Sequence, residues 1–384
     1  MRQFGPILAG LCATLVGIGL QRFAYAPLLP AMVQADWLTA GGAGTLGAAN
    51  FAGYLAGAAL APTVGRRLGM RRALRTAIVL AACCFALCAW PGGLVWFLPW
   101  RTLAGIAGGV LMVLAGPAVQ GVVAPGSRGM AAGVMFAGVG LGIAAGATIV
   151  PALLPAGLPA VWLTLAAVAS ALAVLSWPLW PEAPPPPRAR LPRLRGGPIG
   201  RLVAAYALGG VAATPHMGWW PDYIARGLGQ GTTMGSAYWL LYGVAAACGP
   251  ALCGRLAYRI GVARAFFIGT VVQVVGVALP LTSQAVPVLV LSTALAGATT
   301  VGLTALALTR ALELAGAATP GIWRISTVGW AAAQTATGFV LAWLYTVTGS
   351  HLPLFAVGLV AALGATVLAR PATKKGRHGI PAPP

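Results

Sequence analysis

Long apolar stretches, separated by short polar segments, follow one another along almost the whole chain. Each has roughly 20 residues or more, which is enough for a helix to cross the hydrocarbon core of a bilayer. Twelve such stretches can be marked, at 4–33, 42–63, 73–90, 94–120, 129–154, 157–180, 199–221, 234–257, 262–282, 286–312, 321–347 and 351–370. The pattern predicts an all-α integral membrane protein with twelve transmembrane helices.

The second half of the chain partly repeats the first. Residues 67–73, RLGMRRA, return as RIGVARA at 259–265, and the Leu-Ala-Gly at 103–105 returns at 295–297. Both repeats have an offset of 192 residues and fall at corresponding places in the series of apolar stretches. Duplicated halves with a cleft between them are typical of secondary transporters. We therefore predict two pseudo-symmetric bundles of six helices each.

A proline- and arginine-rich segment, PEAPPPPRARLPRLRGGP, lies at the midpoint, at 181–198. Such a composition stays extended and solvated. We therefore expect a cytoplasmic linker here, between an N-terminal bundle, 1–180, and a C-terminal bundle, 199–370. The polar and basic residues 371–384 are expected to form a cytoplasmic tail.

The composition supports a membrane protein, because 59% of the residues are hydrophobic, only 7% are charged and the mean hydropathy is +0.87. A soluble chain carries about 25% charged residues. The 54 glycines also fit a membrane bundle. Small residues spaced as in Gly53-xxx-Gly57 let helix backbones approach closely in lipid.

The net charge of +20 could indicate a nucleic-acid partner, but the placement of the charges favours another interpretation. If the amino terminus is cytoplasmic, all 24 basic residues except Arg22, Arg101 and Arg226 fall in loops and tails on the cytoplasmic side. The positive-inside rule then places both termini in the cytoplasm. We expect no nucleic-acid partner, and the lipid bilayer as the neighbour of these charges.

No catalytic or metal-binding pattern stands out in the sequence. The six cysteines all fall in predicted helices, without the Cys and His spacing of a metal site. No Ser/His/Asp set or phosphate-cradling loop is visible. We expect a protein that is not an enzyme and that binds no metal and no cofactor.

Several motifs resemble those of a known transporter family. The segment GRLAYRIGVAR, 254–264, resembles the loop signature of the major facilitator superfamily, and PTVGRRLGMRR, 62–72, is its counterpart in the first half. Four further strings resemble the bacterial YbfB/YjiJ-type branch: GLQRFAYAPLLP (19–30), GAANFAGYLAGA (47–58), FAGVGLGI (136–143) and PHMGWWPDYIARGLG (215–229). The resemblance implies a twelve-helix transporter in the bacterial inner membrane that works by alternating access, with no need for more than a monomer.

The two signature loops depart from the superfamily at one position. The family's loop aspartate, which holds the inner gate shut in one state, is replaced by Arg66 in the first half and Tyr258 in the second. Neither side chain can supply that negative charge, so the inner gate must close through packing or other contacts. The candidate gate residues are Arg66, Gly69, Arg71, Tyr258, Arg259 and Gly261.

Two arginines lie inside predicted helices. At 1.5 Å per residue, Arg22 and Arg101 lie roughly 16 and 10 Å below the outer surface, where an arginine costs about 2.5–3.5 kcal/mol. The 192-residue offset pairs them with Thr214 and Thr293, so the scaffold itself does not require the charges. A guanidinium suits carboxylate or phosphate oxygens, and we expect both to bind substrate. Alternatively, Arg22 extends to the membrane surface and Arg101 braces backbone carbonyls.

Uncharged polar residues complete the predicted binding site: Tyr25, Asn50, Tyr54, Tyr238, Tyr242 and Gln334. They could orient a ligand through hydrogen bonds, or equally stitch helices together. Proton coupling would need His216 or Asp222, because the chain has only four acids and none at mid-membrane. The alternative is that His216 is a hydrogen-bonded helix residue and that Asp222 pairs with Arg226.

The function predicted from these features is secondary transport of a small solute, an organic anion, by alternating access between the two halves. The partners would be the small-molecule substrate and either a coupled proton or an exchanged anion. An exporter of lipophilic or cationic drugs is the main alternative. A membrane receptor that does not transport is a second alternative, although the chain shows neither long loops nor a signalling domain.

Overall fold

The computed structural model describes residues 4–124, 127–182, 197–316 and 319–371, and all regular structure in these ranges is helical. The first membrane crossing consists of α1 (Phe4–Thr14), the π-helical η1 (Leu15–Phe23) and α2 (Tyr25–Gln34). The rest of the first half consists of α3 (Ala40–Leu68), α4 (Met70–Leu87), α5 (Gly93–Gln120), α6 (Arg128–Leu153) and α7 (Leu158–Ser176), with short 3-10 turns η3 (Leu154–Ala156) and η4 (Trp177–Leu179). The second half consists of α8 (Gly197–Asp222), the π-helical η5 (Tyr223–Gly227), α9 (Gly231–Ile260), α10 (Val262–Thr282), α11 (Val286–Ala315), α12 (Thr319–Thr348) and α13 (Leu352–Ala369).

The predicted all-α fold with twelve crossings is confirmed, since each apolar stretch coincides with one helix or, for the first stretch, with α1, η1 and α2. Within the described ranges, eight helical segments are by length and composition alone apolar enough to cross a membrane. The others are α3, α4, α8 and α12, whose sequences are more polar. Most of the predicted linker and tail, at 183–196 and 372–384, lies outside the described residues.

The two halves are built alike, as the repeat predicted. In the first half α5 packs against α3 and α4, and α4 packs against α7; in the second half α11 packs against α9 and α10, and α10 packs against α13. The crossing of α3 with α5 and the crossing of α9 with α11 each depend on one glycine, and the two glycines are 192 residues apart. A Cβ at Gly57 would collide with the backbone of Ile106, and one at Gly249 with the backbone of Ala298. In both halves the helices approach this closely because the glycine has no side chain, which would push them apart.

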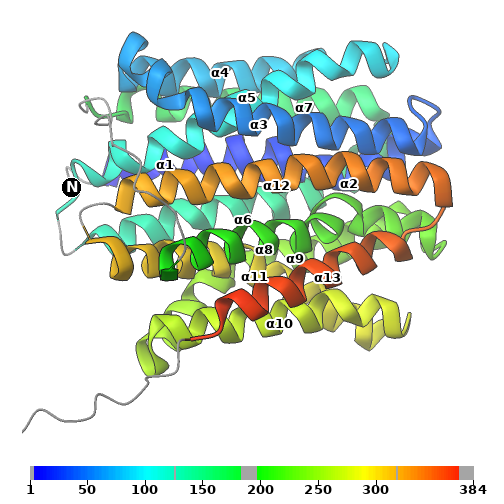
Figure 1. Ribbon diagram of the computed structural model, residues 1–384. Helices are drawn as coiled ribbons and strands as arrows, with labels where there is room; N and C mark the ends of the chain where they lie inside the picture. The colour runs from blue at the N-terminus through cyan, green and yellow to red at the C-terminus, as the bar shows by residue number, and fades with distance from the viewer. Residues whose placement is uncertain (1–3, 125–126, 183–196, 317–318, 372–384) are drawn as a thin grey trace, which may run out of the picture.

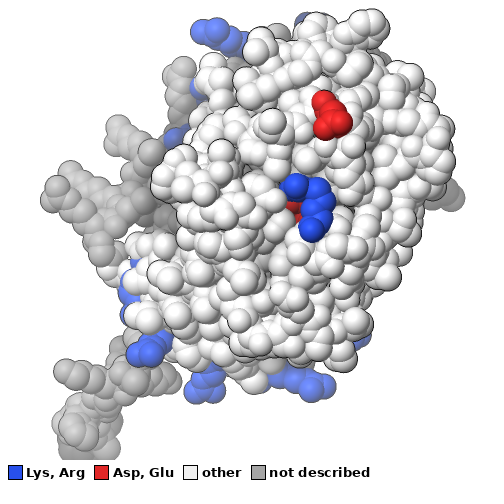
Figure 2. Space-filling view, turned by 90° about the vertical axis from the view of Figure 1, so that its right-hand side faces the viewer, with Lys and Arg blue, Asp and Glu red and all other residues white. Residues whose placement is uncertain are grey.

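The helices run roughly side by side across the bundle, and the amino terminus marks one end of it (Figure 1). We call this the terminal end, because α1 begins there and α13 ends there; the other is the opposite end. The face of the opposite end carries few charged side chains (Figure 2), as the charge distribution predicted. That the terminal end lies in the cytoplasm remains a prediction.

The halves contact each other along two helix pairs, α6 with α9 and α3 with α12. They also meet at the opposite end, where α2 packs against α8. There the Trp219 ring lies against Gly44, and Trp239 Nε1 donates a hydrogen bond to the Phe23 carbonyl at 2.9 Å. No comparable packing joins α5 to α11 in the described ranges. The bundle is therefore closed between its halves at the opposite end.

Candidate substrate-binding site

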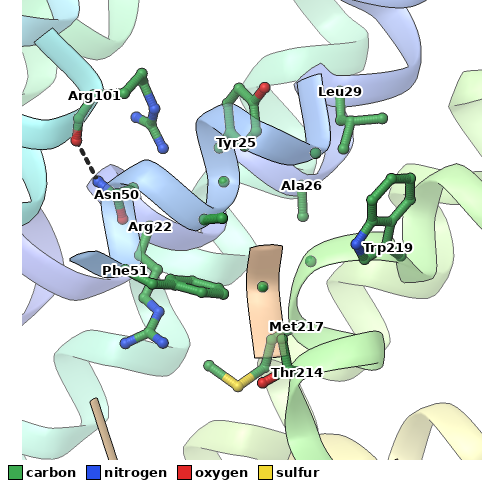
Figure 3. Close-up of a pocket in the computed structure, with 15 residues that line it drawn as sticks. Arg22, Tyr25, Ala26, Leu29, Asn50, Phe51, Arg101, Thr214, Met217 and Trp219 are labelled. Carbon is green, nitrogen blue, oxygen red and sulfur yellow. Dashed lines mark hydrogen bonds between the residues drawn. The ribbon is translucent and has the colours of Figure 1, made fainter. Parts of the chain in front are cut away.

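A cavity of about 430 Å³ lies between the halves and brings four of the predicted residues together. Arg22, Tyr25, Asn50 and Arg101 line it from the first half, and Thr214, Met217 and Trp219 from the second (Figure 3). Because its walls come from both halves, a relative movement of the halves would change its shape. We refer to it as the first cavity.

Arg101 is held in place by neighbours but keeps free hydrogen-bonding groups. Its side chain is 1% exposed, and its Cζ lies 4.5 Å from the centre of the Tyr25 ring. Asn50 Nδ2 donates to the backbone carbonyl of Arg101 at 3.0 Å, which fixes α5 against α3. The Nε and Nη2 groups of Arg101 have no hydrogen-bond partner. Buried donors of this kind are costly when unpaired, so they are available for an acceptor that enters the cavity.

Arg22 lies on the π-helical η1, a geometry that occurs often at functional sites. Its side chain is 9% exposed, and its Cζ lies 4.3 Å from the Phe51 ring centre and 5.2 Å from that of Tyr54. Its Nη2 donates to Gln334 Oε1 on α12, across the boundary between the halves, and its Nε has no partner. Arg22 is thus buried between the halves and does not reach the membrane surface.

Neither arginine has an acidic partner. The chain has four acids, all within the described ranges. Three of them pair with other arginines, as Asp222 with Arg226, Glu182 with Arg71 and Glu313 with Arg310, and Asp36 is exposed. A buried charge without a partner is strongly unfavourable. Arg22 and Arg101 therefore give the space between the halves a positive potential that no carboxylate of the chain neutralises.

A second cavity, of about 530 Å³, lies on the side of Arg22 nearer the terminal end. Arg22 and Met217 line both cavities. The remaining wall of the second cavity is mostly aromatic, with contributions from Phe23, Tyr54, Phe136, Tyr206, Trp323 and Trp330. Its hydroxyl groups come from three threonines, from Tyr54 and from Tyr206, whose Oη donates to Thr304 Oγ1 at 3.1 Å. No pattern in the sequence predicted this cavity.

Comparisons with known proteins identify the family. The family model described as "Uncharacterised MFS-type transporter YbfB" matches residues 14–370. The chain belongs to this family of major facilitator superfamily transporters. No curated protein sequence matches the chain. Its function is therefore transport across a membrane, and the family and fold support a secondary transporter of small molecules.

Solved structures share the fold at low sequence identity. The human organic anion transporter MFSD10 (TETRAN) is 18% identical with a TM-score of 0.73, and the match covers 96% of this chain and 99% of that one. A D-xylose-proton symporter is 18% identical with a TM-score of 0.72, covering 95% and 97%. The xylose transporter XylE from E. coli, in a partially occluded inward open conformation, is 15% identical with a TM-score of 0.73, covering 94% and 96%.

The other predicted binding residues of this YbfB-type transporter lie at different distances from the cavities. Tyr54 lines the second cavity. Gln334 lines neither cavity but contacts two residues that line both, Arg22 and Met217, the latter at 3.1 Å between Nε2 and Sδ. Tyr242 bonds Thr300 Oγ1 at 2.6 Å, and neither Tyr242 nor Tyr238 lines the two cavities. These two tyrosines belong to the packing of α9.

The coupling candidates lie away from both cavities. His216 Nε2 is 3.0 Å from Ser292 Oγ and its ring stacks on Trp220 at 4.5 Å between centres, so it is enclosed within the second half. Asp222 is fully buried at the opposite end, where both carboxylate oxygens accept from Arg226 at 2.5 and 2.6 Å. The pairing with Arg226 was one of the predicted alternatives.

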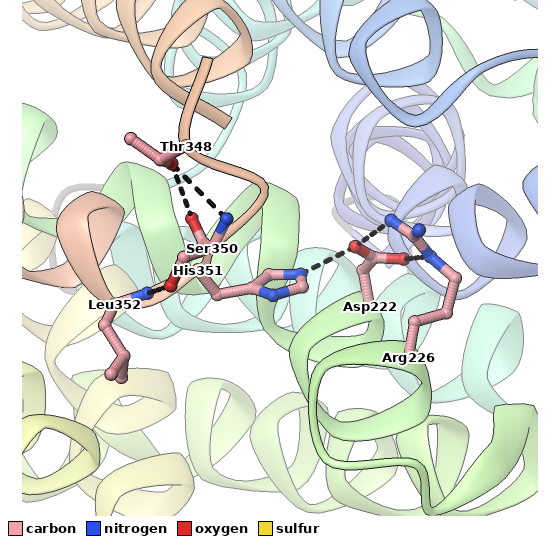
Figure 4. Close-up of polar contacts among 6 residues, drawn as sticks. All are labelled: Asp222, Arg226, Thr348, Ser350, His351 and Leu352. Atoms are coloured by element: carbon pink, nitrogen blue, oxygen red, sulfur yellow. Dashed lines mark hydrogen bonds and ion pairs between the residues drawn. The ribbon is translucent and has the colours of Figure 1, made fainter. Parts of the chain in front are cut away.

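Asp222 has a second partner that the sequence did not indicate. His351, in the turn between α12 and α13, places its Nε2 2.8 Å from Asp222 Oδ2 (Figure 4). The carboxylate thus lies between the imidazole and the guanidinium of Arg226. The two residues are 129 positions apart in the chain, so no local spacing pointed to the contact.

The predicted gate residues occupy the turns at the terminal end. Gly69 and Gly261 have φ of 80° and 84°, a conformation that residues with a Cβ rarely adopt, and each separates two helices. Arg71 binds Glu182 at 2.9 Å and the Trp180 carbonyl at 2.8 Å.

The remaining gate residues extend outward. Arg66 donates to Thr63 Oγ1 at 3.0 Å, Arg259 is exposed, and Tyr258 is 94% exposed. The hydrogen bonds of Arg66 and Arg71 thus stay on the side of the first half.

Proposed function

We propose that this transporter carries a small organic anion by alternating access between its two halves. The observation that carries the proposal is the pair of buried guanidinium groups, Arg22 and Arg101, with unpartnered N–H donors and no acidic partner. Guanidinium and carboxylate form the strong, charge-assisted hydrogen bonds that such donors require. The fold alone does not choose the substrate, because its solved relatives include both an organic anion transporter and a xylose-proton symporter.

The contact between Arg22 and Gln334 supplies a step in this mechanism. It joins η1 of the first half to α12 of the second. A carboxylate that binds Arg22 competes with the neutral amide oxygen of Gln334, because an ionised acceptor binds a guanidinium more strongly. Substrate binding would then weaken one bond between the halves and favour their relative movement. A single chain contains both halves, so a monomer suffices.

With the termini in the cytoplasm of a bacterial cell, the structure would correspond to an inward-facing state, because its halves meet at the opposite end. Opening that end would have to separate α2 from α8. Asp222 and His351, close to the end of α8, are then the candidates for proton coupling, and His216 is a weaker one because Ser292 and Trp220 enclose it. Exchange for a second anion needs none of these groups.

The aromatic wall of the second cavity favours one alternative, the export of a lipophilic compound. Tyr206 and Trp330 lie 4.5 Å apart between ring centres and offer an apolar surface to an amphiphile. A cationic drug fits poorly, because the only charged side chain on either cavity wall is arginine. The anion and the lipophile can be separated by a direct binding experiment.

Thermal unfolding of the purified protein across four compound classes tests the proposal: carboxylates, sugar phosphates, neutral sugars and amines. A ligand at a hundred times its Kd stabilises a protein by about 2.7 kcal/mol, which shifts Tm measurably. We expect stabilisation by an anion, and its loss in the Arg22→Ala/Arg101→Ala double variant. Stabilisation by amines alone, or by anions equally in the double variant, would overturn the proposal.

A further inference from the structure

The two arginines serve different cavities. Arg101 lines only the first cavity, whereas Arg22 lines both. The guanidinium of Arg22 points away from that of Arg101 (Figure 3) and packs against Tyr54, a wall residue of the second cavity. The second cavity therefore has one cationic group, Arg22, which lies where this cavity borders the first.

The rest of the second cavity is suited to a flat ring. The Tyr206 ring lies near two tryptophan rings, with centre-to-centre distances of 4.5 Å to Trp330 and 5.9 Å to Trp323. Aromatic rings attract one another at centre separations of about 4.5–7 Å. No acidic residue lines this cavity, so no carboxylate in its wall would pair with a cation.

We infer that the substrate is an aromatic monocarboxylate, with its carboxylate on Arg22 and its ring against Tyr206 and Trp330. This inference rests on the proposed function and narrows it to one class of anion. A compact dicarboxylate or a phosphate would use the cation but leave the aromatic wall uncovered. A neutral aromatic compound would use the wall but leave the N–H groups of Arg22 without an anion.

Four probe compounds separate the contributions of charge and ring in the purified full-length protein. Phenylacetate has both, phenylacetamide has the ring alone, succinate has charge alone, and phenethylamine has the ring with the opposite charge. We expect phenylacetate to raise Tm at concentrations where the other three do not. With acetate as a further comparison, the affinity of the protein for phenylacetate should be about tenfold higher or more, which corresponds to one or two favourable ring contacts.

Two tryptophans on α12 provide a matched pair of variants. Trp330 faces the second cavity, and Trp343 is 63% exposed on the outside of the bundle. We expect Trp330→Leu to weaken phenylacetate binding about tenfold and Trp343→Leu to leave it unchanged. Tyr206→Leu removes the neighbouring ring and serves as the second test if Trp330→Leu does not fold. Arg22→Gln should abolish the stabilisation by phenylacetate.

The outcomes distinguish this inference from the proposed function. If succinate or inorganic phosphate stabilises the protein and phenylacetate does not, the aromatic class is overturned and the anion proposal stands. Equal effects of phenylacetate and phenylacetamide would show that Arg22 does not bind the carboxylate. Equal binding to the Trp330→Leu and Trp343→Leu variants would overturn the assignment to the second cavity. If no anion stabilises the protein and phenethylamine does, the inference and the proposed function both fail.

Discussion

In the first half of the molecule α3 and α5 cross where Gly57 meets the backbone of Ile106, and in the second half α9 and α11 cross where Gly249 meets that of Ala298. The polar residues at corresponding positions differ. Arg101 on α5 corresponds to Thr293, which bonds the Leu289 carbonyl and accepts from Trp220 within its own half. The other buried cation, Arg22, corresponds to Thr214, which bonds the carbonyl of the preceding turn.

This difference separates the features that the scaffold needs from those that it does not. Both halves fold with a threonine or an arginine at these positions, so packing does not require the guanidinium groups. Their desolvation costs stability in the half that carries them. The second half has its own buried charge, Asp222, but this one is paired with Arg226 and His351. Among the residues that the structure describes, only the first half keeps buried charges without an oppositely charged partner.

The largest effect on stability is expected at the Asp222 cluster. The variant Asp222→Asn leaves Arg226 without its carboxylate, and breaking a buried pair in this way costs about 3–5 kcal/mol. The exposed pair of Arg310 and Glu313 on α11 is the matched control, since Glu313→Gln should cost no more than about 1 kcal/mol. Thermal unfolding measures both. A similar, small loss in the two variants would show that the cluster is not structural.

A smaller loss is expected at the helix crossings, and it should be equal in the two halves. Gly57→Ala and Gly249→Ala each force a Cβ against the backbone of the opposing helix. Overpacking of this kind costs about 1–3 kcal/mol. Gly254→Ala on α9 is the control, because nothing lies within 4 Å of its Cβ position, and alanine favours a helix by about 1 kcal/mol over glycine. Tolerance of one crossing variant but not the other would contradict the shared scaffold.

The smallest change in stability, with the clearest effect on binding, is expected at Gln334. In Gln334→Glu a carboxylate of the chain itself would bind Arg22. The free energy of unfolding of the unliganded protein should change by less than about 1 kcal/mol, because the attraction between the charges offsets their desolvation. Anions should then no longer raise Tm. Gln273, buried in the second half with its Nε2 on the Gly209 carbonyl, has no cation beside it. Gln273→Glu should therefore destabilise the protein. An equal loss of stability in the two variants would argue against a free cation at Arg22.

Much of the fold could be predicted from the sequence, because membrane thickness fixes the length of each apolar stretch and the repeat fixes the pairing of the halves. Arg22 and Arg101 lie inside apolar stretches of the sequence, and both are buried in the bundle. The partners of the polar groups could not be predicted, since Gln334 and Arg22 are 312 positions apart. The aromatic wall was missed for the same reason. Its rings come from separate helices and, taken singly, are indistinguishable from packing residues.

We propose that the buried cations of the first half bind the transported anion. The most direct test of this binding is the uptake of a labelled organic acid, such as phenylacetate, into proteoliposomes that contain the wild-type protein or the Arg22→Thr/Arg101→Thr variant. The variant gives the first half the residues that the second half already carries. We expect uptake by the wild type, and uptake no faster than in protein-free vesicles for a variant whose folding is verified by thermal unfolding. Uptake at the wild-type rate in the folded variant would contradict a role of these cations in binding the anion.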